Sequence, residues 1–383
     1  MKTVTSIVLN NFQNDSRVLK ESISLQNAGY KVKVVALHEE PLQEFDIVQN
    51  IEVHRVKLRS RSWSKHKAIQ LLKYFEFMYR VIREHKHSDI LHCSDLNTLP
   101  VGVTIKKIFN KNAQIVYDAH EYETEINGLH GIQKTLTKKI ERFLIKYADA
   151  VICVSDAIAD EYVKLYNIPK PALVLNTPPF KKIEKKDIFR ETLNIAKDKT
   201  IFLYQGGLSK GRGIEILLDT FKQIGDNKDI IVFMGYGSLE ELVQTASKEY
   251  SNIYFHKAVT PDVLLDYTSS ADFGISTIED SCLSYRYCLP NKMFEYLMAE
   301  IPVIASNLYE IKRLVEDNNI GVVVDENTPN GLEEAIKKAT LLDKEELYVN
   351  IQKAKEIYNW EEQESILLKL YEELVTPEIN SQA

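Results

Sequence analysis

The sequence predicts an α/β protein of two doubly wound domains, each a largely parallel sheet with helices on both faces. The first reason is length, because 383 residues exceed what one hydrophobic core usually organises. The second is pattern, because short apolar, β-branched runs alternate with stretches of helical period in both halves. The third is the segment 176–186, where two prolines and a run of charges have the composition of a linker.

The first half contains runs that are typical of buried parallel strands. They span residues 4–9, 32–37, 51–56, 90–92, 115–117 and 150–154. Between the first two runs, Asp15 or Ser16 is placed to cap a helix that Gly29 ends. This strand–helix–strand order predicts a βαβ unit.

The second half repeats the alternation with its own set of runs. They span residues 200–204, 230–234, 253–255, 273–276, 302–306 and 321–324, and a last helix is expected over residues 360–374. Ligands of such sheets bind at the carboxyl ends of the strands, where helix N-termini point. A site in a cleft between the two domains is therefore expected.

Composition excludes several classes of protein. With 44% hydrophobic residues the chain can form sizeable cores, and it has no run of about 20 apolar residues that could span a bilayer. The first 14 residues are too polar for a secretory signal. The four cysteines form no Cys-x2-Cys pair, so reduced thiols and a cytoplasmic location are expected.

The net charge of −7 is unevenly distributed. From Arg55 to Lys86 there are ten basic residues against two acidic ones, with aromatic residues between them. Such a segment favours anionic lipid headgroups at the inner face of the plasma membrane, although a solvated helix face is the equal alternative. Nucleic acid is disfavoured, because the whole chain is acidic and contains no recognisable binding module.

A glycine-rich loop follows the first strand of the second half. Gly206 and Gly207 precede Lys210, Arg212 and a helix, so backbone N–H groups, a helix N-terminus and two cations are all available to a phosphate. A plain turn is the alternative. The dinucleotide pattern Gly-x-Gly-x-x-Gly is missing after the first strand of the chain, which disfavours a dehydrogenase.

A second helix begins after Pro290. Asn291, Lys292 and Glu295 lie off its apolar stripe, and Lys292 stands in the first turn, where a cation opposes the helix dipole unless an anion binds there. An ordinary surface pair of Lys292 with Glu295 is the alternative. With the glycine loop, this helix could hold a diphosphate, and Glu295 could accept hydrogen bonds from ribose hydroxyls.

These motifs resemble those of the family 4 retaining glycosyltransferases, which have the GT-B fold. The matching segments in the second half are Gly206-Gly207-Leu208 with Arg212-Gly213, Gly235-Tyr236-Gly237, Ala271-Asp272, Pro290-Asn291-Lys292 and Phe294-Glu295-Tyr296. Those in the first half are residues 15–20, His92 with Asp95, and Asp118-Ala119-His120-Glu121. The resemblance implies two Rossmann-like domains facing across a cleft, residues 1–178 and 179–357, and a C-terminal helix, 358–383, that crosses back to the first.

The resemblance also implies roles for individual residues. His120, Arg212 and Lys292 would be catalytic, with His120 contacting the donor sugar. The donor would be bound by Gly206, Gly207, Lys210, Gly235, Gly237, Val259, Asn291 and Glu295, and the acceptor by Asp15, Arg17, Asp95 and Glu121. No metal and no cofactor are expected, because the cations replace a divalent ion and no Asp-x-Asp occurs in the chain.

Three positions depart from the family pattern. Tyr287 stands where the family has the first glutamate of its paired motif, and Gly207 replaces the first basic residue of the phosphate pair. Glu300 stands where the family usually has glycine, so that turn either avoids positive φ or carries about 1 kcal/mol of strain.

The function expected from the resemblance is retaining transfer of a hexosyl group from a nucleotide diphosphate sugar, with a UDP-sugar favoured. The acceptor would be a saccharide or a polyprenyl-linked lipid in cell-surface polysaccharide synthesis, and displacement would occur on the front face of the sugar. A nucleotide-sugar epimerase and a catalytically silent partner subunit are the alternatives, and Tyr287 and Gly207 keep the second one open.

Overall fold

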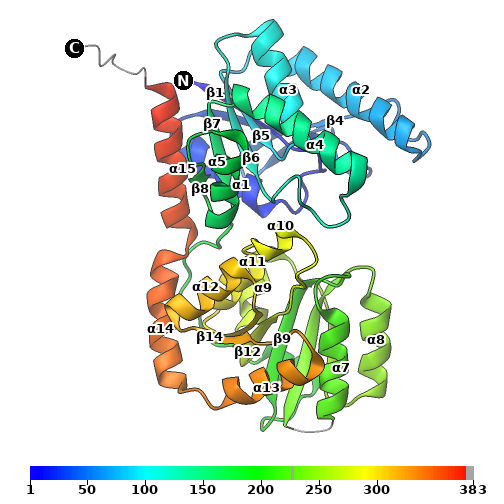
Figure 1. Ribbon diagram of the computed structural model, residues 1–383, viewed down its shortest axis with the longest axis vertical. Coiled ribbons are helices and arrows are strands. Elements are labelled where there is room, and N and C mark those ends of the chain that lie inside the picture. The colour runs from blue at the N-terminus through cyan, green and yellow to red at the C-terminus, as the bar shows by residue number, and fades with distance from the viewer. Residues whose placement is uncertain (226–227, 377–383) are drawn as a thin grey trace. The chain divides into compact units, whose positions relative to one another are not determined.

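The computed structural model describes residues 1–225 and 228–376, and they form two units (Figure 1). Unit 1 comprises Met1–Val174 and Glu364–Ala383, the last seven residues of which lie outside the described part. Unit 2 comprises Leu175–Gln363. Each unit contains one sheet, as the alternating pattern predicts. The domain bounds 178 and 358 stay a prediction.

Unit 1 is built on a sheet with the strand order β3-β4-β2-β1-β5-β6-β7-β8. Its strands are β1 (Thr3–Ile7), β2 (Lys31–Leu37), β3 (Phe45–Val48), β4 (Ile51–Val56), β5 (Ile90–Ser94), β6 (Gln114–Ala119), β7 (Ala150–Cys153) and β8 (Ala172–Leu173). All neighbours are parallel except β3 and β4. The short strands β3 and β8 are absent from the sequence prediction.

Helices cover both faces of this sheet. They are α1 (Ser16–Asn27), α2 (Lys67–His85), α3 (Leu99–Thr104), α4 (Gly131–Leu144), α5 (Asp156–Tyr166) and the later part of α15 (Trp360–Val375), with short turns η1 (Ile105–Phe109) and η2 (Ile145–Tyr147). Val18 of α1 packs on Val34 and Val53 of the sheet. As predicted, Asp15 caps α1 by accepting a hydrogen bond from Val18 N, and Gly29 follows its end with positive φ.

Unit 2 has a six-stranded, fully parallel sheet with the order β11-β10-β9-β12-β13-β14. The strands are β9 (Thr200–Gly207), β10 (Asp229–Tyr236), β11 (Ile253–Lys257), β12 (Phe273–Ser276), β13 (Val303–Ser306) and β14 (Gly321–Val324). Strand β9 runs further than predicted, so that Gly206 and Gly207 end the strand and do not belong to the loop after it.

The helices of unit 2 are α6 to α14. Their bounds are α6 (Ile188–Leu193), α7 (Ile214–Ile224), α8 (Glu240–Glu249), α9 (Pro261–Thr268), α10 (Leu283–Arg286), α11 (Asn291–Met298), α12 (Tyr309–Asn318), α13 (Pro329–Thr340) and α14 (Lys344–Ile357). Leu217, Val243 and Ile336 bring α7, α8 and α13 into one core with Phe202 and Phe233 of the sheet. Helix α11 packs on β12 and β13 and contacts α9 and α14.

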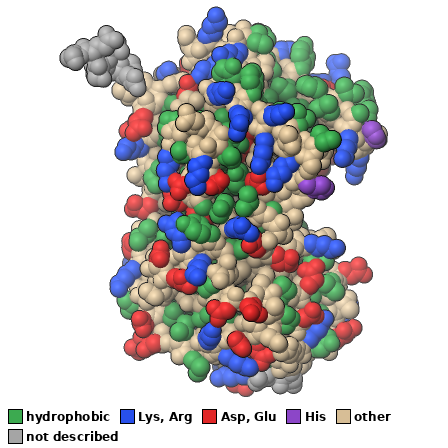
Figure 2. Space-filling view, in the orientation of Figure 1, with side chains coloured by type: hydrophobic (Ala, Val, Ile, Leu, Met, Phe, Trp, Pro, Cys, Tyr) green, Lys and Arg blue, Asp and Glu red, His purple; other side chains and the backbone are tan. Residues whose placement is uncertain are grey.

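Two helices of unit 1 turn large apolar side chains towards solvent. We call these side chains the α2–α4 surface: Leu71, Leu72, Phe75 and Tyr79 of α2, and Ile132, Leu136, Ile140 and Phe143 of α4, each at least 41% exposed. The α4 residues recur at helical spacing and form one stripe. Figure 2 shows green apolar and blue basic side chains interspersed over the region of α2 and α4. No helix in the described part of the chain has the length and apolarity to cross a membrane.

The polar interior of unit 1 includes a residue of the C-terminal helix. Tyr371 of α15 is buried, stacks edge-on against Tyr30, and its hydroxyl lies 2.7 Å from His92 Nδ1. All four cysteines lie within the described ranges and carry thiols, as the sequence predicts.

Candidate functional site

Unit 1 has a polar pocket at the point where its strand order reverses. Strands β1 and β5 are neighbours, and the chain proceeds outwards from them in opposite directions, which makes their carboxyl ends the expected binding position. The pocket has a volume of about 130 Å³ and is lined by Val8, Leu9, Asn10, Asp15, Ser94, Asp95, Asn97 and His120. The ends of β1, β5 and β6 therefore supply its walls.

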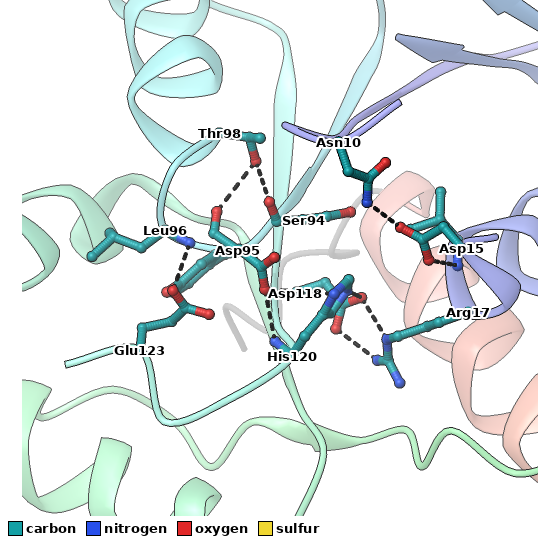
Figure 3. Close-up of polar contacts among 12 residues, drawn as sticks. Asn10, Asp15, Arg17, Ser94, Asp95, Leu96, Thr98, Asp118, His120 and Glu123 are labelled. Atoms are coloured by element: carbon teal, nitrogen blue, oxygen red, sulfur yellow. Dashed lines mark hydrogen bonds and ion pairs between the residues drawn. The ribbon is translucent and has the colours of Figure 1, made fainter. Parts of the chain in front are cut away.

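Asp118, the penultimate residue of β6, organises the charges behind this pocket (Figure 3). Its two carboxylate oxygens accept hydrogen bonds from Arg17 Nε at 2.9 Å and Nη2 at 2.7 Å, and Oδ2 lies 2.7 Å from His120 Nε2. Burial alone would raise the pKa of Asp118, but Arg17 and His120 hold it well below its usual range. Asp118 is therefore a buried anion shared by two cations.

His120 is charged at neutral pH. Burial opposes protonation, but Asp118 and Asp95 outweigh it and raise the pKa of His120 to about 9. Its Nδ1 lies 3.5 Å from Asp95 Oδ1, and the side chain is 20% exposed where it lines the pocket. His120 can thus offer a positive N–H group to a polar ligand.

Asp95 has an unusual backbone conformation for a residue with a side chain. Its φ is 64°, its N–H donates to Asp118 O at 2.8 Å, and its carboxylate accepts from His120 N at 3.3 Å. A non-glycine residue in this region costs on the order of 1–2 kcal/mol. Strain of this kind is typical of positions where a side chain must be aimed at a ligand.

The structure separates the residues predicted to bind the acceptor. Asp15 and Asp95 line the pocket, and Asp15 also caps α1 and accepts a hydrogen bond from Asn10 Nδ2 at 2.7 Å. Arg17 lies behind the pocket, 4% exposed, and bonds Asp118, Glu21 and Val174 O. Arg17 is therefore placed to position Asp118 and not to meet a ligand. Glu121 is exposed and outside the pocket lining.

Sequence reasoning did not select Asp118, His92 or Tyr371 as site residues. His92 Nε2 lies 3.4 Å from both Asp118 and Glu21, and its other ring nitrogen meets Tyr371. The residues that meet here are far apart in the chain, so spacing gave no signal. The sequence signals are that His92 lies in a run that predicts a buried strand, that Asp118 directly follows such a run, and that both stand in motifs that resemble the family's.

Unit 2 has the corresponding reversal of strand order between β9 and β12. Gly206, at the end of β9, has a φ of 112°, and a Cβ atom there would lie 3.6 Å from Lys292 Cε. Helix α11 begins at Asn291, so Lys292 is in its first turn. The glycine strand end and the predicted helix start therefore meet, as expected from the two motifs.

Lys292 is a buried cation whose surroundings do not neutralise it. Its Nζ lies 3.6 Å from the centroid of the Tyr204 ring and has no hydrogen-bond partner within the described residues. Burial, and next the positive charge of Arg212, lower the pKa of Lys292 to about 7. A buried ammonium group that makes no hydrogen bond is costly, and a bound anion would supply what it lacks.

Arg212 belongs to the same cationic site. Its guanidinium carbon lies 4.7 Å from the centroid of the Tyr285 ring. Burial raises the pKa of the Tyr204 hydroxyl, and the positive charge of Arg212 opposes that rise, so Arg212 acts on the same ring as Lys292. Two like charges close enough to repel one another favour an anionic ligand between or beside them.

Glu295 is held in place by a chain of polar contacts. Gln205 Nε2 donates to Glu295 Oε2 at 2.5 Å, and the Thr268 hydroxyl donates to Gln205 Oε1 at 2.8 Å. Glu295 is half-buried one turn after Lys292. Among the other residues predicted to bind the donor, Lys210 and Asn291 are exposed and Val259 is half-buried.

Gly235 and Gly237 have a structural reason to be glycines. A Cβ atom on Gly235 would lie 1.9 Å from Gly206 O, and one on Gly237 would lie 2.4 Å from Leu208 O. The ends of the parallel strands β9 and β10 can approach this closely only because these positions have no side chain. Their contribution to a ligand site is thus at least partly through Gly206 and the loop after it.

The departures from the family pattern are also visible. Tyr287 follows α10 and meets Tyr309 edge-on, with ring centroids 6.0 Å apart. Glu300 has a φ of 62°. Of the two possibilities that the sequence allowed, a turn without positive φ and a strained turn, the structure therefore has the strained one. The Glu300 carboxylate pairs at 2.5 Å with the buried Lys355.

The basic segment from Arg55 to Lys86 is less uniform than its sequence suggests. Arg55 is 2% exposed, pairs with Asp46 and donates to two backbone carbonyls. Lys73 is 8% exposed and donates to the carbonyls of Arg61 and Trp63. The prediction of a basic surface segment from Arg55 to Lys86 is therefore wrong for Arg55 and Lys73, which are buried and stabilise the fold.

The fold and its sites define a class of protein. Two doubly wound domains, with a C-terminal helix that contributes to the first one, form the GT-B fold of glycosyltransferases. Residues 17–177 match the model of Glycosyltransferase Family 4, and residues 199–341 match the model of Glycosyl transferases group 1. The chain belongs to the family 4 glycosyltransferases, which confirms the resemblance read from its motifs.

Curated relatives and solved structures agree with this assignment. An uncharacterized glycosyltransferase of Methanocaldococcus jannaschii, MJ1607, is 22% identical over 79% of either chain. The sucrose-phosphate synthase of Thermosynechococcus elongatus has a TM-score of 0.79 at 18% identity, covering 98% of this chain and 99% of its own. Anabaena Alr3699/HepE, in complex with UDP and glucose, has a TM-score of 0.72 at 14% identity, with the same coverage.

Proposed function

We propose that this glycosyltransferase moves a hexosyl group from a nucleoside diphosphate sugar, preferably a UDP-sugar, with retention of anomeric configuration. The observation that carries the proposal is the cationic site of unit 2, where the buried Lys292 makes no hydrogen bond within the described residues and lies near Arg212. A diphosphate matches this site because its negative charge complements the two cations and its oxygens accept the hydrogen bonds that these cations can donate.

Structural neighbours support a nucleoside diphosphate as the ligand. Solved structures show Anabaena Alr3699/HepE in complex with UDP and with UDP-glucose, and the catalytic domain of starch synthase IV from Arabidopsis thaliana bound to ADP and acarbose. The diphosphate is what these ligands share, whereas the base differs. Our preference for uridine rests on the sequence resemblance, and Val259 near the end of β11 is the proposed contact region for the base.

The proposed chemistry is a front-face displacement at the anomeric carbon. The bond from that carbon to the diphosphate oxygen breaks, a bond to the acceptor oxygen forms on the same face, and the acceptor proton passes to the leaving phosphate. Arg212 and Lys292, with the N-terminus of α11 and the backbone at Gly206, would stabilise the growing negative charge. This arrangement needs no divalent ion for charge neutralisation. Glu295 would accept hydrogen bonds from the ribose.

Unit 1 would contribute the polar contacts for sugar hydroxyls. We assign His120 as a charged donor to the transferred sugar, and Asp15 and Asp95 as acceptors for hydroxyl groups of the acceptor. Arg17 would act through Asp118 as a positioning residue. The acceptor class remains a saccharide or a polyprenyl-linked lipid used in cell-surface polysaccharide synthesis.

We further propose that unit 1 binds the cytoplasmic face of an anionic membrane. The α2–α4 surface exposes apolar side chains, and the exposed basic residues beside it include Lys67, Arg83, Lys139 and Arg142. Both helices contact α3, so α2 and α4 belong to the same layer of helices. Apolar side chains with basic neighbours are the combination that binds anionic lipid surfaces.

The membrane proposal is tested with vesicles of phosphatidylglycerol and of phosphatidylcholine. We expect co-sedimentation with the former, weakened by salt and by the double substitution of Ile132→Glu and Phe143→Glu. Leu341→Glu, at an exposed position of unit 2, is the control that should retain binding. Equal binding by the double variant and the native protein would refute this assignment.

The catalytic proposal is tested by incubating the full chain with UDP-, GDP- and ADP-sugars and candidate acceptors. Acceptor-dependent release of nucleoside diphosphate, with the donor's anomeric configuration retained in the product by NMR, supports it. Interconversion of the sugar without release would favour an epimerase. Neither reaction, together with no binding of any nucleoside diphosphate, would favour a silent partner subunit.

A further inference from the structure

A second group of ligand-type side chains lies in unit 1 away from both strand-end sites. His54 is on β4, and Glu84 and His85 are the last two residues of α2. One donor atom from each of the three lies within 4.8 Å of the others. The group lies where the end of α2 packs against β4, whereas the pocket is lined by the ends of β1, β5 and β6.

The separations of the donor atoms suit a single ion. His54 Nδ1 and His85 Nε2 are 3.1 Å apart, which is close to the edge of a tetrahedron around an ion with metal–nitrogen distances of about 2.0–2.1 Å. Glu84 Oε2 lies 3.7 Å from the His54 ring, on Nε2. Small side-chain rotations of Glu84, whose side chain is 35% exposed, would bring its carboxylate into the coordination sphere.

We propose that His54, Glu84 and His85 form a binding site for a divalent transition-metal ion of the zinc class. Two imidazoles and one carboxylate are a ligand set that such ions prefer, with a water molecule as the fourth ligand. The ion would connect β4 to the C-terminal end of α2 and so stabilise unit 1. This inference goes beyond glycosyl transfer and does not depend on it.

The local chemistry favours the ligating form of both histidines. Burial, and next His54, lower the pKa of His85 to about 4, and burial also lowers the pKa of His54. Both rings are therefore neutral at pH 7, and each can turn a lone pair to a metal while the other nitrogen keeps its proton. In the absence of an ion the two facing nitrogens form one N–H···N hydrogen bond.

The surroundings position the rings and contain charges of both signs. Phe45 of β3 stacks on His54 with centroids 4.7 Å apart and an interplanar angle of 11°. Lys33 opposes a cation, but it is paired with Glu52 at 3.1 Å, and Glu44 adds negative charge near His54. Arg83 pairs with Glu84 Oε1, which leaves Oε2 for the ion.

The test uses the full-length protein stripped with a chelator and then titrated with Zn²⁺ or Co²⁺. We expect one equivalent to bind, the visible bands of four-coordinate Co²⁺ to appear, and Zn²⁺ to raise the thermal midpoint by about 3 °C or more. His85→Ala should abolish the bands and the midpoint shift, and Glu84→Gln should weaken binding at least about tenfold. His87→Ala, an exposed neighbour, is the matched control and should bind as the native protein does.

Two results would overturn the proposal. One is the failure of the native protein to bind Zn²⁺ or Co²⁺ at micromolar concentrations. The other is binding that His85→Ala and Glu84→Gln leave unchanged, which would place the ion elsewhere. Circular dichroism shows whether the variants fold. Glycosyl transfer is not a readout, so its failure and the failure of this proposal are distinguishable.

Discussion

The two units share one topology and differ in how they treat charge at the point where the strand order reverses. In unit 1 the cations Arg17 and His120 are balanced within the protein by two carboxylates, Asp118 and Asp95. In unit 2 the cations Lys292 and Arg212 lie on tyrosine rings, and Lys292 has no hydrogen-bond acceptor among the described residues. The strand order therefore locates a site, while the balance of charge around it determines what it can bind.

This difference has a chemical meaning. A site that is already neutral suits an uncharged ligand rich in hydroxyl groups, because no strong charge has to be displaced or compensated. A site with uncompensated positive charge suits a polyanion. The proposed division into an acceptor unit and a donor unit follows from this contrast.

The largest expected effect tests the neutralised site. Asp118→Asn removes the anion shared by Arg17 and His120 and leaves buried positive charge uncompensated, so we expect a loss of about 3–5 kcal/mol of stability. Urea denaturation followed by circular dichroism measures it. Asp160→Asn, at an exposed ion pair, should cost less than about 1 kcal/mol. Equal effects of the two substitutions would contradict the contrast drawn here.

A second effect concerns the raised pKa of His120. Because the folded-state pKa is about 9 and the unfolded value is 6.5, the stabilisation is fully present below pH 6.5 and is lost as the pH rises through 9. Its full size is up to about 3 kcal/mol. The free energy of unfolding of the native protein minus that of His120→Gln should therefore fall between pH 6 and pH 9.5. His87→Gln is the control, and a difference independent of pH would argue against a charged His120.

A third effect tests the uncompensated site. If Arg212 stabilises the leaving diphosphate, Arg212→Ala should reduce turnover by roughly 10²-fold, which corresponds to about 2.7 kcal/mol. Steady-state kinetics with the donor identified by screening measures the change. Arg313→Ala, an exposed arginine of the same unit, should leave turnover within about twofold. Native turnover in Arg212→Ala would remove this residue from the site.

The smallest expected effect tests whether Lys292 changes its protonation state when the nucleotide sugar binds. Because the pKa of Lys292 is about 7, its amine is largely neutral at higher pH and must take up a proton when the diphosphate binds. Affinity for the nucleotide sugar should therefore fall up to about tenfold per pH unit between pH 7 and pH 8.5. Isothermal titration calorimetry measures both the affinity and the proton uptake. Lys292→Arg keeps its charge across this range, and its affinity should not change with pH. The same slope in both proteins would exclude Lys292 as the titrating group.

Sequence reasoning predicted the sheets better than their edges. The buried central strands are continuous apolar runs, and all of them are found. Strand β3 was missed because Phe45 and Ile47 point to solvent on an antiparallel edge, where no second layer enforces an apolar pattern. Strand β8 was missed because two residues are too few to show any period.

The candidate sites were predicted unevenly for a related reason. Lys292 and Gly206 are recognisable because each stands in a local motif at a helix start or a strand end. That Lys292 is buried on Tyr204 could not be predicted, because Tyr204 fits equally well as an ordinary core residue of β9. The arrangement around Asp118 depends on residues from β5, α1 and α15, and no local pattern reports such long-range contacts.

The contact between His92 and Tyr371 joins residues 279 positions apart in the chain. During synthesis on the ribosome, residues 1–174 leave the exit tunnel long before Tyr371 is translated. The buried polar cluster of unit 1 therefore stays open to water until Tyr371 has left the tunnel. Completion of unit 1 thus has to wait for the synthesis of unit 2, which lies between the two parts of unit 1 in the chain.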